Sequence, residues 1–297
     1  MTGAIAALLP SRARAAPARP IVIASKSDTE GRLLGHLIAL ILEGLGLQVE
    51  PRLGLGPTLI VRSALLAGEI DLYPEYTGNV AFFSGTETDP AWKSAGTAYR
   101  LAARLDAARG LVWLARAPAD NTWLIAVQGR LARERSLVTM ADFAGAVRAD
   151  LIRLAASTEF VESPAALPSF EAAYGFNLPL SRIISLPGGD TAVTARAAAE
   201  GISGVNAGMV YGTDGALAAL DLTVMSDPKG AQIVYEPAPV IRAETLARHP
   251  QIRDALDSVF ARLDAETLRQ LNAAITVEGR TASAVAADWL GRQAGRP

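Results

Sequence analysis

Residues 21–73 alternate between apolar runs of strand length and amphipathic stretches of helical length. Apolar runs rich in β-branched residues predict strands at residues 21–24, 48–53 and 70–73. Helical patterns lie between them, and Pro57 is well placed for the first turn of the second helix, where its missing N–H has no partner to lose. Strands that alternate with helices predict a parallel sheet covered by helices.

The same alternation returns in the middle of the chain, and the end of the chain is predicted to be helical. After Pro239 the pattern is nearly all helix, and Asp190 is expected to be the N-cap of a helix over residues 191–199. No boundary carries a Gly/Ser-rich or Pro-rich linker, so ordered strands are expected to join two α/β blocks. The other expected strands are residues 112–115, 122–127, 151–155, 182–186 and 208–211. The other expected helices are residues 91–109, 164–174, 244–249, 251–262, 265–277 and 282–292.

Composition removes several classes of function. The 297 residues carry 28 Lys and Arg against 30 Asp and Glu, which is no basic footprint for a nucleic acid. There is no cysteine, so disulfides, thiol nucleophiles and cysteine-bound zinc are excluded. The two histidines, His36 and His249, lie far apart, and no metal or other cofactor is predicted. The longest apolar stretch, residues 33–47, is too short and too polar to span a bilayer.

The amino terminus resembles a short export signal. Residues 2–9 form an apolar run, and Ala13-Arg14-Ala15 has the small-x-small pattern of a cleavage site. We expect residues 1–19 to be a signal peptide, with the folded protein starting near Pro20 in the periplasm. A disordered, alanine-rich tail is the alternative.

Enzyme motifs are poorly represented. Gly54-Leu55-Gly56 follows a predicted strand as a dinucleotide-binding loop would, but Pro57 removes a backbone donor and Leu59 stands where the third glycine belongs. Asp71 and Glu75 flank a strand end and form either a carboxylate pair or an ordinary strand terminus and turn. We therefore predict no catalytic residue. The alternative is a periplasmic enzyme with Asp71 or Glu75 as its acid or base.

Several aromatic residues stand where predicted strands end. They are Tyr73, Tyr76, Trp123, Tyr211 and Tyr235. Ligands of open α/β sheets bind outside the carboxyl ends of the strands. Rings that converge there form a box of π faces, which attracts a cation that cannot donate hydrogen bonds, above all a quaternary ammonium. Ordinary core packing is the alternative for each ring taken alone.

A set of motifs resembles one protein family along residues 20–292. The specific stretches are Ser25-Lys26-Ser27-Asp28-Thr29-Glu30, Gly68-Glu69-Ile70-Asp71-Leu72-Tyr73-Pro74-Glu75-Tyr76-Thr77-Gly78, Gly188-Gly189-Asp190-Thr191-Ala192-Val193, Tyr211-Gly212-Thr213-Asp214-Gly215 and Tyr235-Glu236-Pro237-Ala238-Pro239-Val240. Together they resemble the extracytoplasmic substrate-binding proteins of osmoprotectant ABC importers, the glycine betaine/choline-binding family. Residues 121–123 and 159–162 are most similar to its OsmF/YehZ branch.

The resemblance implies an α/β fold, the two-lobed periplasmic binding protein of type II. Each lobe would be a mainly parallel sheet flanked by helices, and two hinge strands would join the lobes. We expect residues 20–123 with 226–297 to form lobe I and residues 124–225 to form lobe II, with crossings near Trp123 and Met225. The resemblance further implies a monomer that delivers a small quaternary ammonium ligand to an ABC permease and its ATPase subunits. A receptor that informs a sensor would have the same motifs.

The resemblance also implies the site. Lys26 matches a lysine that meets the ligand carboxylate, and Asn79 stands where relatives use a threonine hydroxyl for the same task. The cage residues that match, or replace, the family's aromatic side chains are Tyr76, Trp123, Tyr211 and Tyr235.

One position departs from the family pattern. Relatives commonly carry an arginine three residues after the "EF" pair, and that arginine clamps the betaine carboxylate. Here the position is Ser163, preceded by Glu162. A carboxylate clamp without its arginine loses a strong charge-assisted pair, so glycine betaine is expected to bind weakly. A choline-like alcohol or a larger betaine would suffer less.

Overall fold

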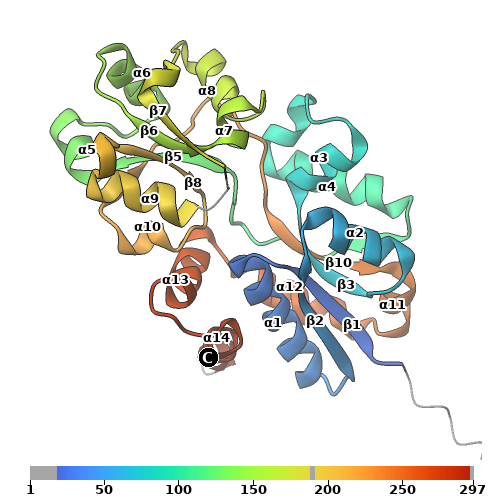
Figure 1. The fold of residues 1–297 in the computed structure, drawn as a ribbon. Coiled ribbons are helices and arrows are strands. Elements are labelled where there is room, and N and C mark those ends of the chain that lie inside the picture. Colours follow the sequence, from blue (N-terminus) through green and yellow to red (C-terminus); the bar gives the residue numbers. More distant parts are fainter. Residues whose placement is uncertain (1–18, 188–190, 295–297) are drawn as a thin grey trace, which may run out of the picture.

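Two five-stranded sheets organise the protein (Figure 1). The structure, a computed structural model, describes residues 19–187 and 191–294. The first sheet has the strand order β2-β1-β3-β10-β4. Its strands are β1 (Ile21–Lys26), β2 (Val49–Gly56), β3 (Leu72–Tyr76), β4 (Leu111–Trp113) and β10 (Pro237–Arg242).

The second sheet comes from the middle of the chain. Its strand order is β7-β6-β8-β5-β9. The strands are β5 (Trp123–Gln128), β6 (Leu154–Ser157), β7 (Ile183–Leu186), β8 (Ala207–Tyr211) and β9 (Leu222–Val224). The predicted two-block α/β class is confirmed.

Both sheets are mixed rather than simply parallel. In the first sheet β10 runs antiparallel to its neighbours β3 and β4, whereas β2, β1 and β3 are parallel. In the second sheet β5 likewise runs antiparallel to its neighbours β8 and β9. Each reversed strand follows a segment in which the chain passes from one sheet to the other. Such a strand enters its sheet at the carboxyl ends of the parallel strands. It therefore runs antiparallel to them.

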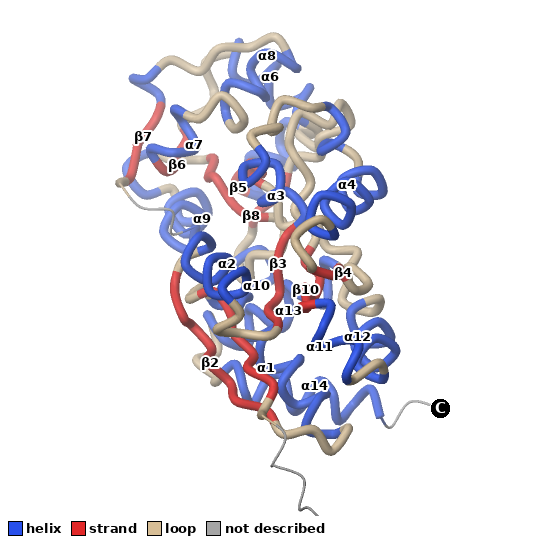
Figure 2. Tube along the Cα trace, turned by 90° about the vertical axis from the view of Figure 1, so that its right-hand side faces the viewer, coloured by secondary structure: helices blue, strands red, loops and turns tan. Residues whose placement is uncertain are grey.

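Helices cover both sheets (Figures 1 and 2). The apolar face of α1 packs in the first sheet's core together with the last helices of the chain. A separate hydrophobic core joins the second sheet to its helices and includes Phe143, Phe160 and Phe170. The α-helices are α1 (Thr29–Gly44), α2 (Thr58–Ala67), α3 (Thr77–Ser84), α4 (Ala95–Ala107), α5 (Gly129–Arg135), α6 (Met140–Arg148), α7 (Thr158–Glu162), α8 (Leu167–Tyr174), α9 (Thr191–Glu200), α10 (Ala216–Ala219), α11 (Ala243–Arg248), α12 (Gln251–Phe260), α13 (Ala265–Thr276) and α14 (Ala282–Ala294). Short 3₁₀ helices are η1 (Pro90–Lys93), η2 (Leu180–Arg182) and η3 (Ile202–Gly204).

Strand β10 corrects the prediction of a chain that is nearly all helix after Pro239. Pro237 and Pro239 argue against an interior strand because proline cannot donate to a ladder. Here both prolines serve as acceptors: the Pro239 carbonyl accepts from Leu114 N, and the Pro237 carbonyl accepts from Ala117 N. The strand therefore tolerates both prolines between two neighbours.

The two segments that connect the sheets run side by side. Tyr235 N donates to Asp120 Oδ1 at 2.7 Å, and Thr122 Oγ1 donates to the Ile233 carbonyl at 2.7 Å. Met225 and Ala231 pack in the second sheet's core, whereas Ile233 packs in the first. We therefore propose crossings at residues 120–122 and 232–233. The predicted boundary at Met225 lies several residues before the second.

Two sequence predictions fall outside the described residues. They are the export signal at residues 1–19, of which the structure describes only residue 19, and the N-cap at Asp190, which follows the glycines of the third motif. Among the residues that the structure describes, no helix is both long and apolar enough to cross a membrane.

Candidate functional site

A cavity of about 910 Å³ lies between the two sheets. Residues of β1, α1, β3 and α3 line it on the side of the first sheet, and residues of β5, α7, α9 and β8 line it on the other. The crossing segments supply Asn121 and Tyr235, and the C-terminal helix α13 supplies Asn272 and Thr276. Segments from the whole length of the chain thus meet around one space.

The structure places all six predicted ligand-binding residues around this cavity. Three of them are the last residues of parallel strands, namely Lys26 of β1, Tyr76 of β3 and Tyr211 of β8. Trp123 is the first residue of the reversed strand β5, so it lies at the same edge as Tyr211, its register partner. Asn79 and Tyr235 complete the set. Their binding of a ligand stays a prediction.

Tyr76 is held at its hydroxyl and at its ring face. The side chain is only 3% exposed, and its hydroxyl donates to Glu30 Oε1 at 2.6 Å. The Lys26 ammonium lies 3.8 Å from the centre of the Tyr76 ring, the arrangement of a cation–π contact. Burial, followed by the neighbouring Glu30 charge, raises the pKa of Tyr76 well above its ordinary value, so the hydroxyl is a donor.

The other three rings are fixed by packing and by backbone contacts. Trp123 stands edge-on to Phe160, with ring centres 6.2 Å apart. Burial raises the pKa of Tyr211, and a hydrogen bond with Trp123 partly opposes that rise. Tyr211 N donates to Asp214 Oδ2 at 2.7 Å. The Tyr235 ring lies so close to Gly78 that a Cβ there would come within 2.6 Å of it. Glycine at residue 78 of the second motif thus makes room for the Tyr235 ring of the fifth motif.

The Asn79 amide group is partly engaged within the protein. Its Nδ2 donates to Glu75 Oε1 at 2.7 Å, the atom that also accepts from Tyr76 N. One of the two amide protons is therefore committed to Glu75. Glu75 acts as a support beneath the cavity and fixes both Asn79 and the Tyr76 backbone.

The two carboxylates of the enzyme alternative both accept hydrogen bonds within the protein. Glu75 is fully buried and also accepts from the Tyr73 hydroxyl. Asp71 accepts from Val22 N at 2.9 Å and from Thr245 Oγ1 at 2.8 Å. Neither side chain lines the cavity. Ser163, at the departure from the family motif, directly follows α7 and is likewise absent from the cavity wall, although Glu159 of α7 contributes to it.

Three residues that the sequence reasoning missed form one corner of the cavity. Glu30 accepts from Asn272 Nδ2 at 2.8 Å and from Asn121 Nδ2 at 3.3 Å. Burial raises the pKa of Glu30, against the hydrogen bonds from Thr213, Tyr76 and Asn272. Glu30 and Asn121 lie inside the motifs quoted above, which marked their segments but gave them no role. Asn272 lies in no motif.

Acidic side chains outnumber basic ones around the cavity. Lys26 is the basic residue among the described lining residues, whereas the acidic ones are Asp28, Glu30, Glu159 and Asp214. Asp28 also caps α1 by accepting from Gly31 N at 2.7 Å. This balance favours a cationic ligand or the cationic end of a zwitterion. The described residues hold no cluster of three or more His, Asp or Glu side chains that could bind a metal ion.

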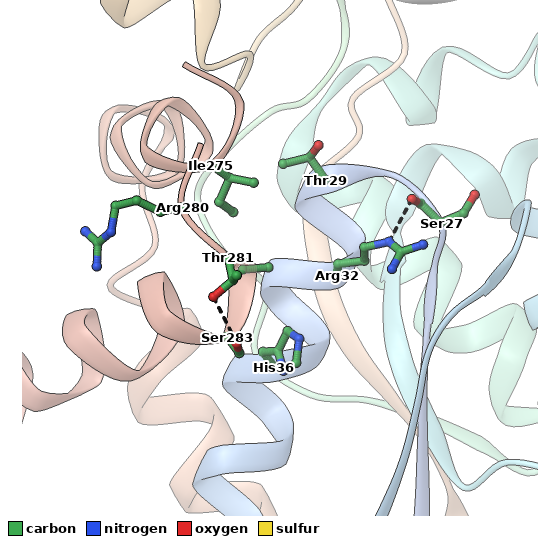
Figure 3. A pocket seen from close by; sticks show the side chains of 9 residues that line it. Ser27, Thr29, Arg32, His36, Ile275, Arg280, Thr281 and Ser283 are labelled. Carbon is green, nitrogen blue, oxygen red and sulfur yellow. Dashed lines mark hydrogen bonds between the residues drawn. The ribbon is translucent and has the colours of Figure 1, made fainter. Parts of the chain in front are cut away.

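A second, smaller cavity of about 360 Å³ lies between α1 and the turn from α13 to α14 (Figure 3). Arg32 and Arg280 line it together with His36. Figure 3 shows the two guanidinium groups extending to opposite sides, and Arg32 Nε donates to the Ser27 carbonyl at 3.1 Å. Arg280 pairs with Asp288. The two cations do not converge on a common point, so this cavity offers no anion clamp.

Comparisons with known proteins give matches that cover almost the whole chain. The model of the substrate-binding domain of ABC-type glycine betaine transport systems matches residues 19–292. The glycine betaine-binding protein YehZ of Escherichia coli is 51% identical over 92% of this chain and 90% of its own length. A glycine-betaine-binding protein of Pseudomonas aeruginosa is 32% identical over 93% of this chain and 88% of its own.

A solved structure agrees with the sequence comparisons. Ligand-free YehZ from Escherichia coli superposes with a TM-score of 0.83 at 50% identity, over 93% of this chain and 99% of that one. The family resemblance of the motifs and the two-lobed fold are thereby confirmed. The family consists of substrate-binding proteins of transporters and not of enzymes. From its matched length, its motifs and its fold, the protein belongs to the substrate-binding domains of ABC-type glycine betaine transport systems.

Proposed function

We propose that this protein captures a small quaternary ammonium osmolyte, of the glycine betaine/choline type, for an ABC importer. The observation that carries the proposal is the meeting of Tyr76, Trp123, Tyr211 and Tyr235 around one cavity. A quaternary ammonium cannot donate hydrogen bonds, so ring faces are its natural partners. The acidic balance of the cavity wall supports the same polarity.

The strength of such a cage is limited. Each cation–π contact contributes about 0.5–2 kcal/mol, and the upper value needs a desolvated site. Four contacts of about 2 kcal/mol would correspond to a Kd of about 1 µM before the costs of binding are subtracted. Ser163 in place of an arginine leaves the carboxylate of glycine betaine without a guanidinium partner. Binding of glycine betaine is therefore proposed to be weak.

Closure around the ligand is the proposed mechanism. Tyr76 belongs to the first sheet and Tyr211 to the second, so a ligand between them contacts both halves of the molecule. A ligand that makes both sets of contacts only when the halves approach stabilises the closed arrangement. An ABC permease and its ATPase subunits would then recognise the closed form. The chain itself is proposed to catalyse nothing and to act as a monomer in the periplasm.

Titration calorimetry tests the cage. Replacement of Tyr211 or Tyr235 by alanine is expected to weaken the binding of choline and glycine betaine about tenfold or more, a loss of about 1.4 kcal/mol. Tyr211→Phe is the matched control because it keeps the ring and loses only the hydroxyl, so its affinity should stay near that of the wild type. Unchanged affinity in Tyr76→Ala, Tyr211→Ala and Tyr235→Ala would refute the cage.

Export can be tested separately. Mass spectrometry of the protein from its native host is expected to show a chain that begins near Pro20. An intact Met1 in the mature protein would contradict periplasmic delivery by a cleaved signal.

A further inference from the structure

At one corner of the cavity the side-chain donors around a buried carboxylate are engaged, whereas two acceptor atoms have no partner among the described residues. Its centre is Glu30, whose side chain is 5% exposed. Glu30 Oε1 accepts from the Tyr76 hydroxyl at 2.6 Å and from Asn121 Nδ2 at 3.3 Å. Glu30 Oε2 accepts from Asn272 Nδ2 at 2.8 Å. The carboxylate thus determines which way both amide groups point.

This arrangement leaves the amide oxygens of Asn121 and Asn272 without a hydrogen-bond donor among the described residues. Asn272 Nδ2 also donates to the Thr213 carbonyl at 2.9 Å, so the nitrogen end of that amide is doubly engaged. Asn272 Oδ1 and Asn121 Oδ1 are both buried, and neither has a hydrogen-bond partner in the described part of the chain. Asn272 is itself 5% exposed, and both residues line the cavity. Buried polar atoms are nearly always paired in native proteins, so two orphan acceptors at one place need an explanation.

We propose that Glu30 and the amide oxygens of Asn121 and Asn272 form a subsite for a hydrogen-bond donor on the ligand. The inference rests on the proposed function and specifies its ligand class. The ligand is a quaternary ammonium compound that also carries an O–H or N–H group, as choline does. A betaine has only a carboxylate at the corresponding end, and a carboxylate offers these oxygens no proton.

The subsite adjoins the aromatic cage through one side chain. Tyr76 places its ring in the cage, and its hydroxyl donates to Glu30 in the subsite. The cation of a small ligand can therefore lie against the rings while its donor group reaches the acceptors. Lys26, the nearby cation, lies over the Tyr76 ring and does not supply the missing protons.

The subsite also spans elements that are far apart in the chain. Glu30 belongs to α1, Asn121 to the first crossing segment and Asn272 to α13. Helix α13 in turn contacts α10, next to the second sheet. A donor bound here would tie the C-terminal helix to the crossing segment, and its recognition would be coupled to the relative position of the two halves.

A pair of ligands isolates the donor. Choline and (2-methoxyethyl)trimethylammonium have the same cation and nearly the same size, but only choline has an O–H group. Calorimetry on the mature wild-type protein is expected to show at least tenfold tighter binding of choline, which corresponds to about 1.4 kcal/mol. Glycine betaine is expected to bind more weakly than choline. Equal affinity for choline and its methyl ether would overturn the subsite.

The same measurement separates this proposal from the cage. If the methyl ether and tetramethylammonium bind and choline has no advantage over them, the subsite fails and the cage stands. If none of the three cations binds, the proposed function fails.

Single substitutions test which residue is responsible for the preference for choline over its methyl ether. Asn272→Ala removes one orphan oxygen and is expected to reduce the advantage of choline over its methyl ether to about twofold or less. Gln270→Ala, an exposed amide on the same helix, is the matched control and should keep the full advantage. An unchanged ratio in a folded Asn272→Ala protein would contradict the assignment. If that variant does not fold, the wild-type comparison of the two ligands decides.

Discussion

Lys26 covers one face of the Tyr76 ring, and a cationic ligand that stacks on this face is predicted to compete with Lys26. The ammonium lies 3.8 Å from the centre of the Tyr76 ring, within the distance of a cation–π contact. A quaternary ammonium ligand can stack on the same face only after Lys26 has moved away. The protein thus carries an internal competitor for one of its four rings.

The size of the effect follows from the strength of that contact. A cation–π contact is worth about 0.5–2 kcal/mol, so its displacement by the ligand costs up to that amount. Lys26→Ala removes the cost, and the affinity for choline or tetramethylammonium is expected to rise by about twofold to thirtyfold. Glycine betaine should gain less or lose affinity, because its carboxylate also loses the only basic side chain among the described lining residues.

Calorimetry with choline and glycine betaine on the same preparation measures this divergence. Lys93→Ala is the control, because it removes the same charge from a lysine that does not line the cavity. Equal losses of affinity for both ligands in Lys26→Ala would refute the competition and would assign Lys26 a general supporting role. An affinity for choline that stays at the wild-type value would refute it as well.

Two further predictions concern the supports of the site. Gly78→Ala would place a Cβ within 2.6 Å of the Tyr235 ring, so it should weaken choline binding about tenfold or more in calorimetry while a thermal melt stays near that of the wild type. Gly145→Ala, where a Cβ meets nothing within 4 Å, should change binding little. Burial raises the pKa of Asp120 from 3.8 to about 6, so the folded protein binds this proton more tightly than the unfolded chain does. The resulting stabilisation, up to about 3 kcal/mol, is complete below about pH 4 and is lost as the pH rises through about 6. Urea unfolding of Asp120→Asn between pH 4 and 7 should lack this component, and a pH dependence equal to that of the wild type would contradict it.

The fold was accessible to sequence reasoning where local signals agree. The strand at residues 21–24 and the helix after it were predictable because β-branched residues precede Thr29, Glu30 and an amphipathic stretch, and the structure adds Asp28 as the cap of that helix. Helix α3 was missed, because the apolar residues of Thr77–Ser84 are not gathered on one face and show no helical period. Strand β10 was missed because Pro237 and Pro239 argue against a strand locally, whereas their carbonyls complete hydrogen bonds to a distant segment.

The site was predictable only as far as its motifs extend. The position of Tyr76, Tyr211 and Tyr235 around the cavity was predictable because strand ends and family motifs coincide there. The acceptor corner was not found, because Asn272 meets Glu30 across 242 positions of sequence and no spacing rule links them. A role that exists only through a long-range contact leaves no local pattern, and only the folded arrangement brings such a role to light.

The contacts of Tyr76 account for the spacing of Lys26 and Glu30, which lie four positions apart in the first motif. Lys26 ends β1, Asp28 caps α1, and Glu30 lies in the first helical turn. This strand-to-helix turn directs the lysine to the ring face and the glutamate to the hydroxyl of one tyrosine. An insertion between the two would leave either the ring or the hydroxyl unsupported. The spacing therefore fixes the position of a ring that the cage and the acceptor corner share.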